Sequence, residues 1–255
     1  MALHDDPPAL SDRALAASRR VWLFDLDDTL HDATGASMRG INEAMTDYVV
    51  QHLSLSHDEA SALRRRYWQR YGATLIGLVR HHGVRAAHFL EETHRLPDLE
   101  SRLRVNVHDR AALRRLPGRK FVLTNAPRAY ALRVLEALRL ADAFDGVITV
   151  EDMRMFGHHR PKPDRRMFRH LMARLKVRPQ DCVLVEDTLQ HQRAARSLGM
   201  KTIWMQRYIR AAVHASRAEV EVGVHACKKP TYVCARINQI QTLRALWCHS
   251  DERRP

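Results

Sequence analysis

The chain lacks long hydrophobic runs and has few cysteines, and both absences limit the class of protein that it can be. None of its apolar runs approaches the ~20 residues that cross a bilayer, so we expect no membrane partner. Its first residues, acidic and proline-rich, do not match the basic-then-apolar layout of a secretory signal. The four cysteines have the irregular spacing of reduced thiols rather than of a disulfide framework. These features predict a cytoplasmic protein.

Lysine is also scarce, although the chain is strongly basic. Its 42 Lys and Arg residues against 29 Asp and Glu give a formal net charge of +13. Only six of the 42 are lysines, and the other 36 are arginines. Such an excess attracts polyanions and phosphate-bearing substrates, but a genome-wide preference for arginine would give the same balance. Because the basic residues are scattered in pairs and triplets, a nucleic-acid partner is possible but not favoured.

Three common ligand-binding motifs are missing from the sequence. There is no Gly-x₄-Gly-Lys-Ser/Thr, no Gly-x-Gly-x-x-Gly and no Gly-x-Ser-x-Gly. These absences exclude the usual phosphate-binding loop, the usual dinucleotide-binding site and the nucleophile elbow of α/β-hydrolases. The cysteines and histidines near the C-terminus also lack the paired short spacings of a zinc site. Any active site must therefore come from another pattern.

A short apolar stretch followed by acidic residues organises the chain. Residues 21–24 are four consecutive apolar residues, which predicts a strand that is buried on both faces. Asp25, Asp27 and Asp28 follow at once, where the strand would leave the sheet. Like charges this close repel one another, so they indicate a bound cation or a reaction. Ligands of open α/β sheets bind beyond the carboxyl ends of the strands.

The rest of the chain alternates apolar strand patterns with helical ones. We predict an α/β fold, a doubly wound parallel sheet with right-handed crossovers. A further edge strand is expected at residues 232–237 and a closing helix at 238–247. The other expected strands cover residues 120–124, 146–150, 182–187 and 202–205, and the expected helices cover 128–138, 164–176 and 189–198.

A long helical block separates the first two strands. From about Ser37 to Leu96 the apolar residues recur at helical spacing, and Gly72, Gly77 and Gly83 are expected to separate short helices. This block is too long for an ordinary crossover, so it predicts an inserted cap. We therefore expect three parts: a leader (1–20), an α/β core (21–32 and 105–255) and a helical cap domain (33–104).

Four polar sites follow the predicted strands in an order that resembles a known family. Asp25-x-Asp27-x-Thr29 after an apolar strand is similar to the first motif of the haloacid dehalogenase (HAD) superfamily, whose members are mostly phosphohydrolases. Thr124, Lys162 and Asp187 suit its second, third and fourth motifs in order and separation. One large class of the superfamily also carries a helical cap at this place. The resemblance implies a HAD-like Rossmannoid core with an inserted cap.

The resemblance implies a catalytic role for each matched residue. Asp25 would attack a phosphoryl group and form an aspartyl-phosphate, and Asp27 would protonate the leaving oxygen and then activate water. Thr124 and Asn125 would bind the phosphoryl group, and Lys162 would bind it and neutralise its charge. Taken singly, each position has a structural explanation, such as a helix cap, a turn or a solvated loop lysine. All four together favour the catalytic interpretation.

The same resemblance implies a magnesium site. Asp25, the main-chain carbonyl of Asp27 and Asp187 would hold Mg²⁺, with Glu186 behind them. One departure affects this site, because His191 stands where related proteins commonly have Asn, Asp or Gly. The imidazole could reach the metal ligands or lie along its helix face, and we expect the helix face.

A stretch of the cap resembles one subfamily. Residues 71–78 are similar to the Tyr-Gly-Thr-Thr-Leu-x-Gly-Leu segment of pyrimidine 5′-nucleotidase-like HAD proteins. Residues 116–120 and 185–188 are also similar to other parts of that group. The substrate implied is a pyrimidine nucleoside monophosphate. Leu75, Leu78 and Val79 are also spaced like a buried helix face, so plain packing would explain the stretch equally well. The alternatives are a small phosphate such as phosphoglycolate, or a nucleic-acid-binding protein that retains the fold without turnover.

Overall fold

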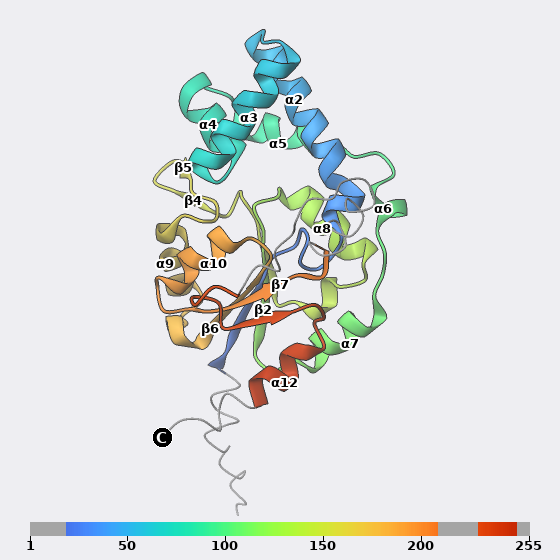
Figure 1. Cartoon of the computed structure of the whole chain (residues 1–255), viewed down its shortest axis with the longest axis vertical. Helices are drawn as coiled ribbons and strands as arrows, with labels where there is room; N and C mark the ends of the chain where they lie inside the picture. Colours follow the sequence, from blue (N-terminus) through green and yellow to red (C-terminus); the bar gives the residue numbers. More distant parts are fainter. Residues whose placement is uncertain (1–18, 209–228, 249–255) are drawn as a thin grey trace, which may run out of the picture.

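The computed structural model describes residues 19–208 and 229–248, and it consists of an α/β core beneath a helical cap (Figure 1). Six strands form one sheet in the order β3-β2-β1-β6-β7-β8, and every neighbouring pair is parallel. The predicted doubly wound sheet is confirmed. The strands are β1 (Val21–Phe24), β2 (Arg119–Leu123), β3 (Gly146–Ile148), β6 (Cys182–Glu186), β7 (Lys201–Met205) and β8 (Ala235–Ile237).

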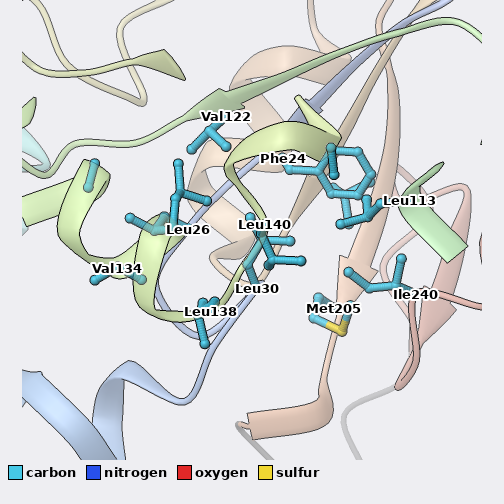
Figure 2. Packing of buried hydrophobic residues seen from close by; sticks show 14 of the residues in the cluster. Phe24, Leu26, Leu30, Leu113, Val122, Val134, Leu138, Leu140, Met205 and Ile240 are labelled. Atoms are coloured by element: carbon cyan, nitrogen blue, oxygen red, sulfur yellow. The ribbon is translucent and has the colours of Figure 1, made fainter. Parts of the chain in front are cut away.

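Helices cover both faces of the sheet, because the apolar side chains of β1 point alternately to the two faces and must be covered on each. Trp22 and Phe24 point into one cluster with α7 (Val107–Arg115), α8 (Arg128–Ala137) and α12 (Thr242–Cys248), part of which Figure 2 shows. Val21 and Leu23 point into the opposite cluster, with α9 (Arg165–Arg174) and α10 (Leu189–Arg196). All four residues of β1 are fully buried. Strand β1 therefore lies at the centre of the core, which fixes where its last residue leaves the sheet.

The segment between β1 and β2 is helical and has a hydrophobic core of its own. Tyr48, Leu63, Leu78 and Phe89 pack together in this core, and the helices of the segment lie above the sheet in Figure 1. The helical insertion predicted from the sequence is confirmed. Its elements are the π-helical turn η1 (Thr34–Met38) and the helices α2 (Arg39–Leu53), α3 (His57–Tyr71), α4 (Thr74–His82), α5 (Ala86–Thr93) and α6 (Leu99–Arg102).

Of the three glycines expected to separate cap helices, two end a helix and the third does not. Gly72 and Gly83 terminate α3 and α4 with φ of 78° and 64°, in the left-handed region that favours glycine. Gly77 instead lies inside α4, so its expected role as a helix separator is wrong. A Cβ at Gly77 would come within 2.1 Å of the Tyr67 ring. Glycine is needed there because α4 packs directly against this ring.

Three further segments complete the comparison with the sequence. Between β3 and Pro163 the chain forms a two-stranded hairpin, β4 (Arg154–Met155) and β5 (His158–His159), which was not among the expected strands. Most of the predicted leader lies outside the described residues. The edge position of β8 is confirmed, although the strand is shorter than expected. No helix within residues 19–208 and 229–248 is long and apolar enough to cross a membrane.

Candidate active site

Three carboxylates meet at the ends of the two central strands. Strands β1 and β6 pair in parallel, with Phe24 opposite Val185, so the residues that follow them lie side by side. Oxygen atoms of Asp25, Glu186 and Asp187 all lie within 4.8 Å of one another. The parallel register therefore brings together acidic residues that are 161 positions apart in the sequence, counting from Asp25 to Glu186.

Lys162 provides the positive charge in this cluster. Its Nζ donates to Asp25 Oδ1 at 2.6 Å and to Glu186 Oε2 at 2.7 Å, and the side chain is 1% exposed. Burial alone would lower the pKa of Lys162, but the two carboxylates outweigh burial and raise it above its ordinary value. The ammonium group is therefore a permanent charge of the site.

Asn125 holds the backbone of Lys162 in place. The Asn125 side-chain amide donates to the carbonyl of Lys162 at 2.9 Å, and its oxygen accepts from the Lys162 N–H at 2.9 Å. Thr124, the residue before it, is 1% exposed, and its hydroxyl oxygen accepts from the Ala126 N–H at 3.0 Å. Both residues line the cavity. Binding of substrate by Thr124 and Asn125 stays a prediction, and the pairing with Lys162 gives Asn125 a positioning role that the sequence did not indicate.

The lysine compensates only part of the acidic charge. Burial and the neighbouring Glu186 raise the pKa of Asp25 to about 7 and that of Asp187 to about 10. Burial would also raise the pKa of Glu186, but Lys162 and His191 reverse the shift and lower it below its usual range. Three converging carboxylates with a deficit of positive charge are the hard oxygen donors that Mg²⁺ prefers. The donor set of this structure fits a divalent cation.

Asp27 lies on the same side of the sheet and is oriented by two residues that sequence analysis missed. Tyr130 O–H donates to Asp27 Oδ1 at 2.8 Å, and His31 Nε2 lies 3.0 Å from the same oxygen. Asp28 lines the same cavity, and its carboxylate accepts from the backbone N–H and the hydroxyl of Thr34. Only the spacing of His31, four positions after Asp27, offered a signal in the sequence. Tyr130 offered none.

His191 lies against the acidic cluster. Its Nδ1 is 3.1 Å from Glu186 Oε2, the side chain is 13% exposed, and the residue lines the cavity. The expectation that His191 would lie along its helix face, away from the site, is therefore wrong. The first turn of α10 begins directly after the Asp187–Thr188 pair, so residue 191 faces back over the end of β6.

A cavity of about 480 Å³ lies between this cluster and the cap. Its floor carries the predicted residues Asp25, Asp27, Thr124, Asn125, Lys162, Glu186 and Asp187, which the structure therefore brings together. The roof is largely apolar, and its polar side chains are Asn42, Arg64, Arg65, Thr74 and His94. The apolar residues of the roof are Met38, Ile41, Met45, Trp68, Leu75, Phe89 and Leu90.

A parallel sheet with a carboxylate cluster and a buried lysine at its strand ends, beneath a helical lid, defines a class of capped α/β enzymes. The family model described as haloacid dehalogenase-like hydrolase matches residues 20–199, and a second model, described as HAD-hydrolase-like, matches residues 159–240. The chain belongs to the haloacid dehalogenase-like hydrolase family.

Individual relatives are distant. The chain is 26% identical over 208 residues to "Phosphate metabolism protein 8" of Saccharomyces cerevisiae, a match that covers 76% of this chain and 63% of that protein. It is 27% identical over 212 residues to the "N-acylneuraminate-9-phosphatase" of Homo sapiens, covering 74% of this chain and 83% of that protein. The solved structure of a HAD phosphatase from Thermococcus onnurineus superposes with a TM-score of 0.57 at 21% identity, covering 89% of this chain and 97% of that one. This likeness confirms the fold.

Proposed function

We propose that this chain is a Mg²⁺-dependent phosphomonoesterase that acts through an aspartyl-phosphate on Asp25. The observation that carries the proposal is the contact of buried Lys162 with Asp25 and Glu186, next to Asp187 and open to the cavity. An anionic nucleophile, a fixed cation and a place for a second cation are the groups that phosphoryl transfer needs. The phosphatase named among the relatives supports the same reaction class.

In the first half of the proposed reaction, Asp25 attacks phosphorus and the bond between phosphorus and the leaving alcohol breaks. Lys162 and the hydroxyl of Thr124 stabilise the charge on the phosphoryl oxygens. Asp27 donates a proton to the leaving alcohol, and His31 and Tyr130 hold its carboxyl group in position for this transfer.

In the second half, Asp27 takes a proton from water as the water attacks phosphorus, which releases phosphate and frees Asp25. Mg²⁺, when bound, supplies positive charge that offsets the repulsion between the phosphoryl group and the acidic floor. The ion would be held by Asp25, Asp187 and the main-chain carbonyl of Asp27. Glu186 positions the Lys162 ammonium by accepting its hydrogen bond.

For the substrate we propose a pyrimidine nucleoside monophosphate. The cap stretch 71–78 supports this class through its resemblance to the nucleotidase segment. The roof also offers groups suited to a base: the indole of Trp68, and the guanidinium of Arg64, whose hydrogen bonds to Asn42 and Thr46 fix it at the cavity wall. A volume of about 480 Å³ suits a ligand of this size.

One observation favours a second class, a phosphorylated sugar acid. Within the described part of the chain Arg64 has no carboxylate partner, and burial lowers its pKa. A carboxylate on the leaving alcohol would supply the missing counter-charge, and the N-acylneuraminate named by the human relative carries one. We also propose that residues 33–104 form the cap domain and that residues 21–32 and 105–255 form the core. Cap residues between Tyr48 and Leu90 support this division because they share one hydrophobic cluster, whereas Ile41 and Leu99, nearer the ends of the cap, pack in the cluster of the core.

Phosphate release from a panel of esters tests the proposal. The panel holds UMP, CMP, AMP, phosphoglycolate, N-acetylneuraminate 9-phosphate and p-nitrophenyl phosphate, each with Mg²⁺ and with excess chelator. We expect hydrolysis that depends on Mg²⁺, with UMP and CMP preferred. Activity that persists in chelator would refute the metal-dependent mechanism, and equal rates for all nucleotides and acids would refute the substrate class. Binding to RNA that weakens steeply with salt, without any turnover, would favour the nucleic-acid alternative.

A further inference from the structure

His94 lies in the cavity beside the residues that orient Asp27. It is the residue that ends helix α5, and it lines the same cavity as Asp25 and Lys162. Its ring packs edge-to-face against Tyr130, with 5.6 Å between the ring centroids and an interplanar angle of 69°. Tyr130 in turn donates to Asp27. His94 is thus next to the side of the pocket where a leaving alcohol would depart, and the mechanism above gives it no role.

The hydrogen bonds of His94 determine which ring nitrogen carries the proton. Nδ1 lies 3.0 Å from the carbonyl oxygen of Leu90, which can only accept a hydrogen bond, and 3.0 Å from Thr93 Oγ1. The Thr93 hydroxyl already donates to the carbonyl of Phe89 at 2.7 Å, so towards His94 it too can only accept. Nδ1 is therefore the donor.

The other nitrogen, Nε2, is left as a free acceptor. Burial lowers the pKa of His94 to about 4, so the ring is neutral near pH 7 and Nε2 keeps its lone pair. No group in residues 19–208 or 229–248 bonds to Nε2. Unlike the unpaired polar atoms that are fully buried, Nε2 stays accessible. The lone pair is accessible from the cavity that the ring lines.

We propose that His94 Nε2 accepts a hydrogen bond from a hydroxyl group of the leaving alcohol, so that the pocket selects phosphate esters of polyols. The ribose of a nucleotide is such an alcohol, whereas glycolate has no hydroxyl left once it is phosphorylated. The inference rests on the proposed phosphomonoesterase function and specifies its substrate class. On this proposal His94 determines substrate specificity, rather than only packing against Tyr130.

Two conservative variants separate these roles. The amide of Asn overlaps Nδ1 of histidine, so His94→Asn keeps a donor for the Leu90 carbonyl and loses the acceptor in the cavity. The amide of Gln reaches the position of Nε2, so His94→Gln keeps an acceptor there. His88→Asn is the matched control, since His88 lies on the same helix but bonds to Tyr48 and does not line the cavity.

The experiment compares kcat/KM for UMP and for 2′,3′-dideoxyuridine 5′-monophosphate, which lacks both ribose hydroxyls. Glycerol 3-phosphate and n-propyl phosphate form a second pair with the same contrast, and p-nitrophenyl phosphate reports phosphatase activity without any hydroxyl. We expect the wild type, His94→Gln and His88→Asn to prefer the hydroxylated ester by about 10-fold, and His94→Asn to lose that preference. A purely structural role would lower both members of a pair equally.

The possible outcomes distinguish the two proposals. A wild-type enzyme that hydrolyses both members of each pair equally would overturn the role of His94. The same conclusion would follow if His94→Asn kept the full preference. Absence of turnover with every ester, p-nitrophenyl phosphate included, would instead overturn the phosphomonoesterase function itself.

Discussion

The floor and the roof of the cavity are built on different principles. On the floor, charged side chains from strand ends satisfy one another: Lys162 bonds to two carboxylates, and Asn125 fixes the lysine backbone. On the roof, apolar side chains from cap helices surround polar groups that keep bonding capacity among the described residues: Arg64 has no carboxylate partner there, and no group bonds to His94 Nε2. Preorganised charge suits a reaction that is the same for every ester. Unsatisfied donors and acceptors suit the choice between esters.

The difference follows from how each part is held. The floor is fixed by the parallel register of β1 and β6 at the centre of the sheet. Much of the roof is held by helix packing in the cap cluster around Tyr48, Leu78 and Phe89, although the roof residue Ile41 packs in the core cluster. Roof side chains held in the cap cluster can therefore change with little effect on the floor, which predicts that floor variants lose activity on all esters and such roof variants lose it selectively.

Asp25→Asn should give the largest effect and should not depend on the ester. An amide is not a nucleophile towards phosphorus, so we expect kcat to fall on the order of 10⁴-fold. Because burial and Glu186 raise the pKa of Asp25, a neutral group is tolerated at this position and the melting temperature should change little. Phosphate release and thermal unfolding measure the two parts. Asp28→Asn is the control, since Asp28 lines the same cavity but, among the described residues, its carboxylate bonds to Thr34 and not to Lys162. Retained turnover in the Asp25→Asn variant would contradict the proposed mechanism.

Lys162→Met should destabilise the floor. The change leaves Asp25 and Glu186 without their buried cation, and breaking such a group by removing one partner costs about 3–5 kcal/mol. Urea unfolding without Mg²⁺ at neutral pH measures the loss. Lys120→Met is the matched control, because the Lys120 ammonium bonds to the carbonyls of Leu116 and Gly118 rather than to a charge. Equal losses in both variants would show that the charge cluster is not the cause.

Removal of Mg²⁺ should make the stability of the floor depend on pH. In the metal-free protein, burial and Glu186 raise the pKa of Asp25 to about 7 and of Asp187 to about 10, so the folded state binds protons that the unfolded state has released. This contribution is complete below about pH 4 and is lost as the pH rises through about 7 and then about 10. We expect the free energy of unfolding to fall by several kcal/mol between about pH 6 and about pH 9.

Saturating Mg²⁺ should flatten that dependence, because the cation favours the ionised carboxylates. Thermal unfolding at the two pH values, with Mg²⁺ and with chelator, is the measurement. An Asp187→Asn variant should show a shallower pH dependence in chelator and a smaller gain from Mg²⁺. A metal-free protein that becomes more stable with rising pH over this range would contradict the proposed charge balance.

The floor was predictable from the sequence because one rule covers it. Asp25 directly follows the apolar run 21–24, and Asp187 comes two positions after the apolar run 182–185. Both runs predict buried strands, and parallel strands end at the same edge of the sheet. The contact between Tyr130 and Asp27 was not predictable. These residues are 103 positions apart and Tyr130 lies on an amphipathic helix, where a tyrosine reads as packing.

The roof could not be predicted because its geometry comes from helix packing rather than strand order. Gly77 was expected to break a helix, but it lies inside one and lacks a side chain because the Tyr67 ring occupies that position. His94 ends a helix, and nothing in its neighbours' residue types indicates that its ring turns towards Tyr130. His191 was misplaced for a related reason, since the direction of α10 after β6 decides whether position 191 faces Glu186.

Arg64→Gln should have the smallest effect, and it isolates the roof. We expect kcat/KM for UMP to fall about 10-fold, because a guanidinium hydrogen bond to the base is lost, while p-nitrophenyl phosphate changes less than about twofold. Arg66→Gln is the control: it removes the same charge from α3, but Arg66 lies over the Tyr67 ring and does not line the cavity. Arg64 also ties α3 to α2 through Asn42. If this hydrogen bond were the whole contribution of Arg64, kcat/KM would fall equally for both esters. Arg64 would then not select between esters, as we expect of the roof.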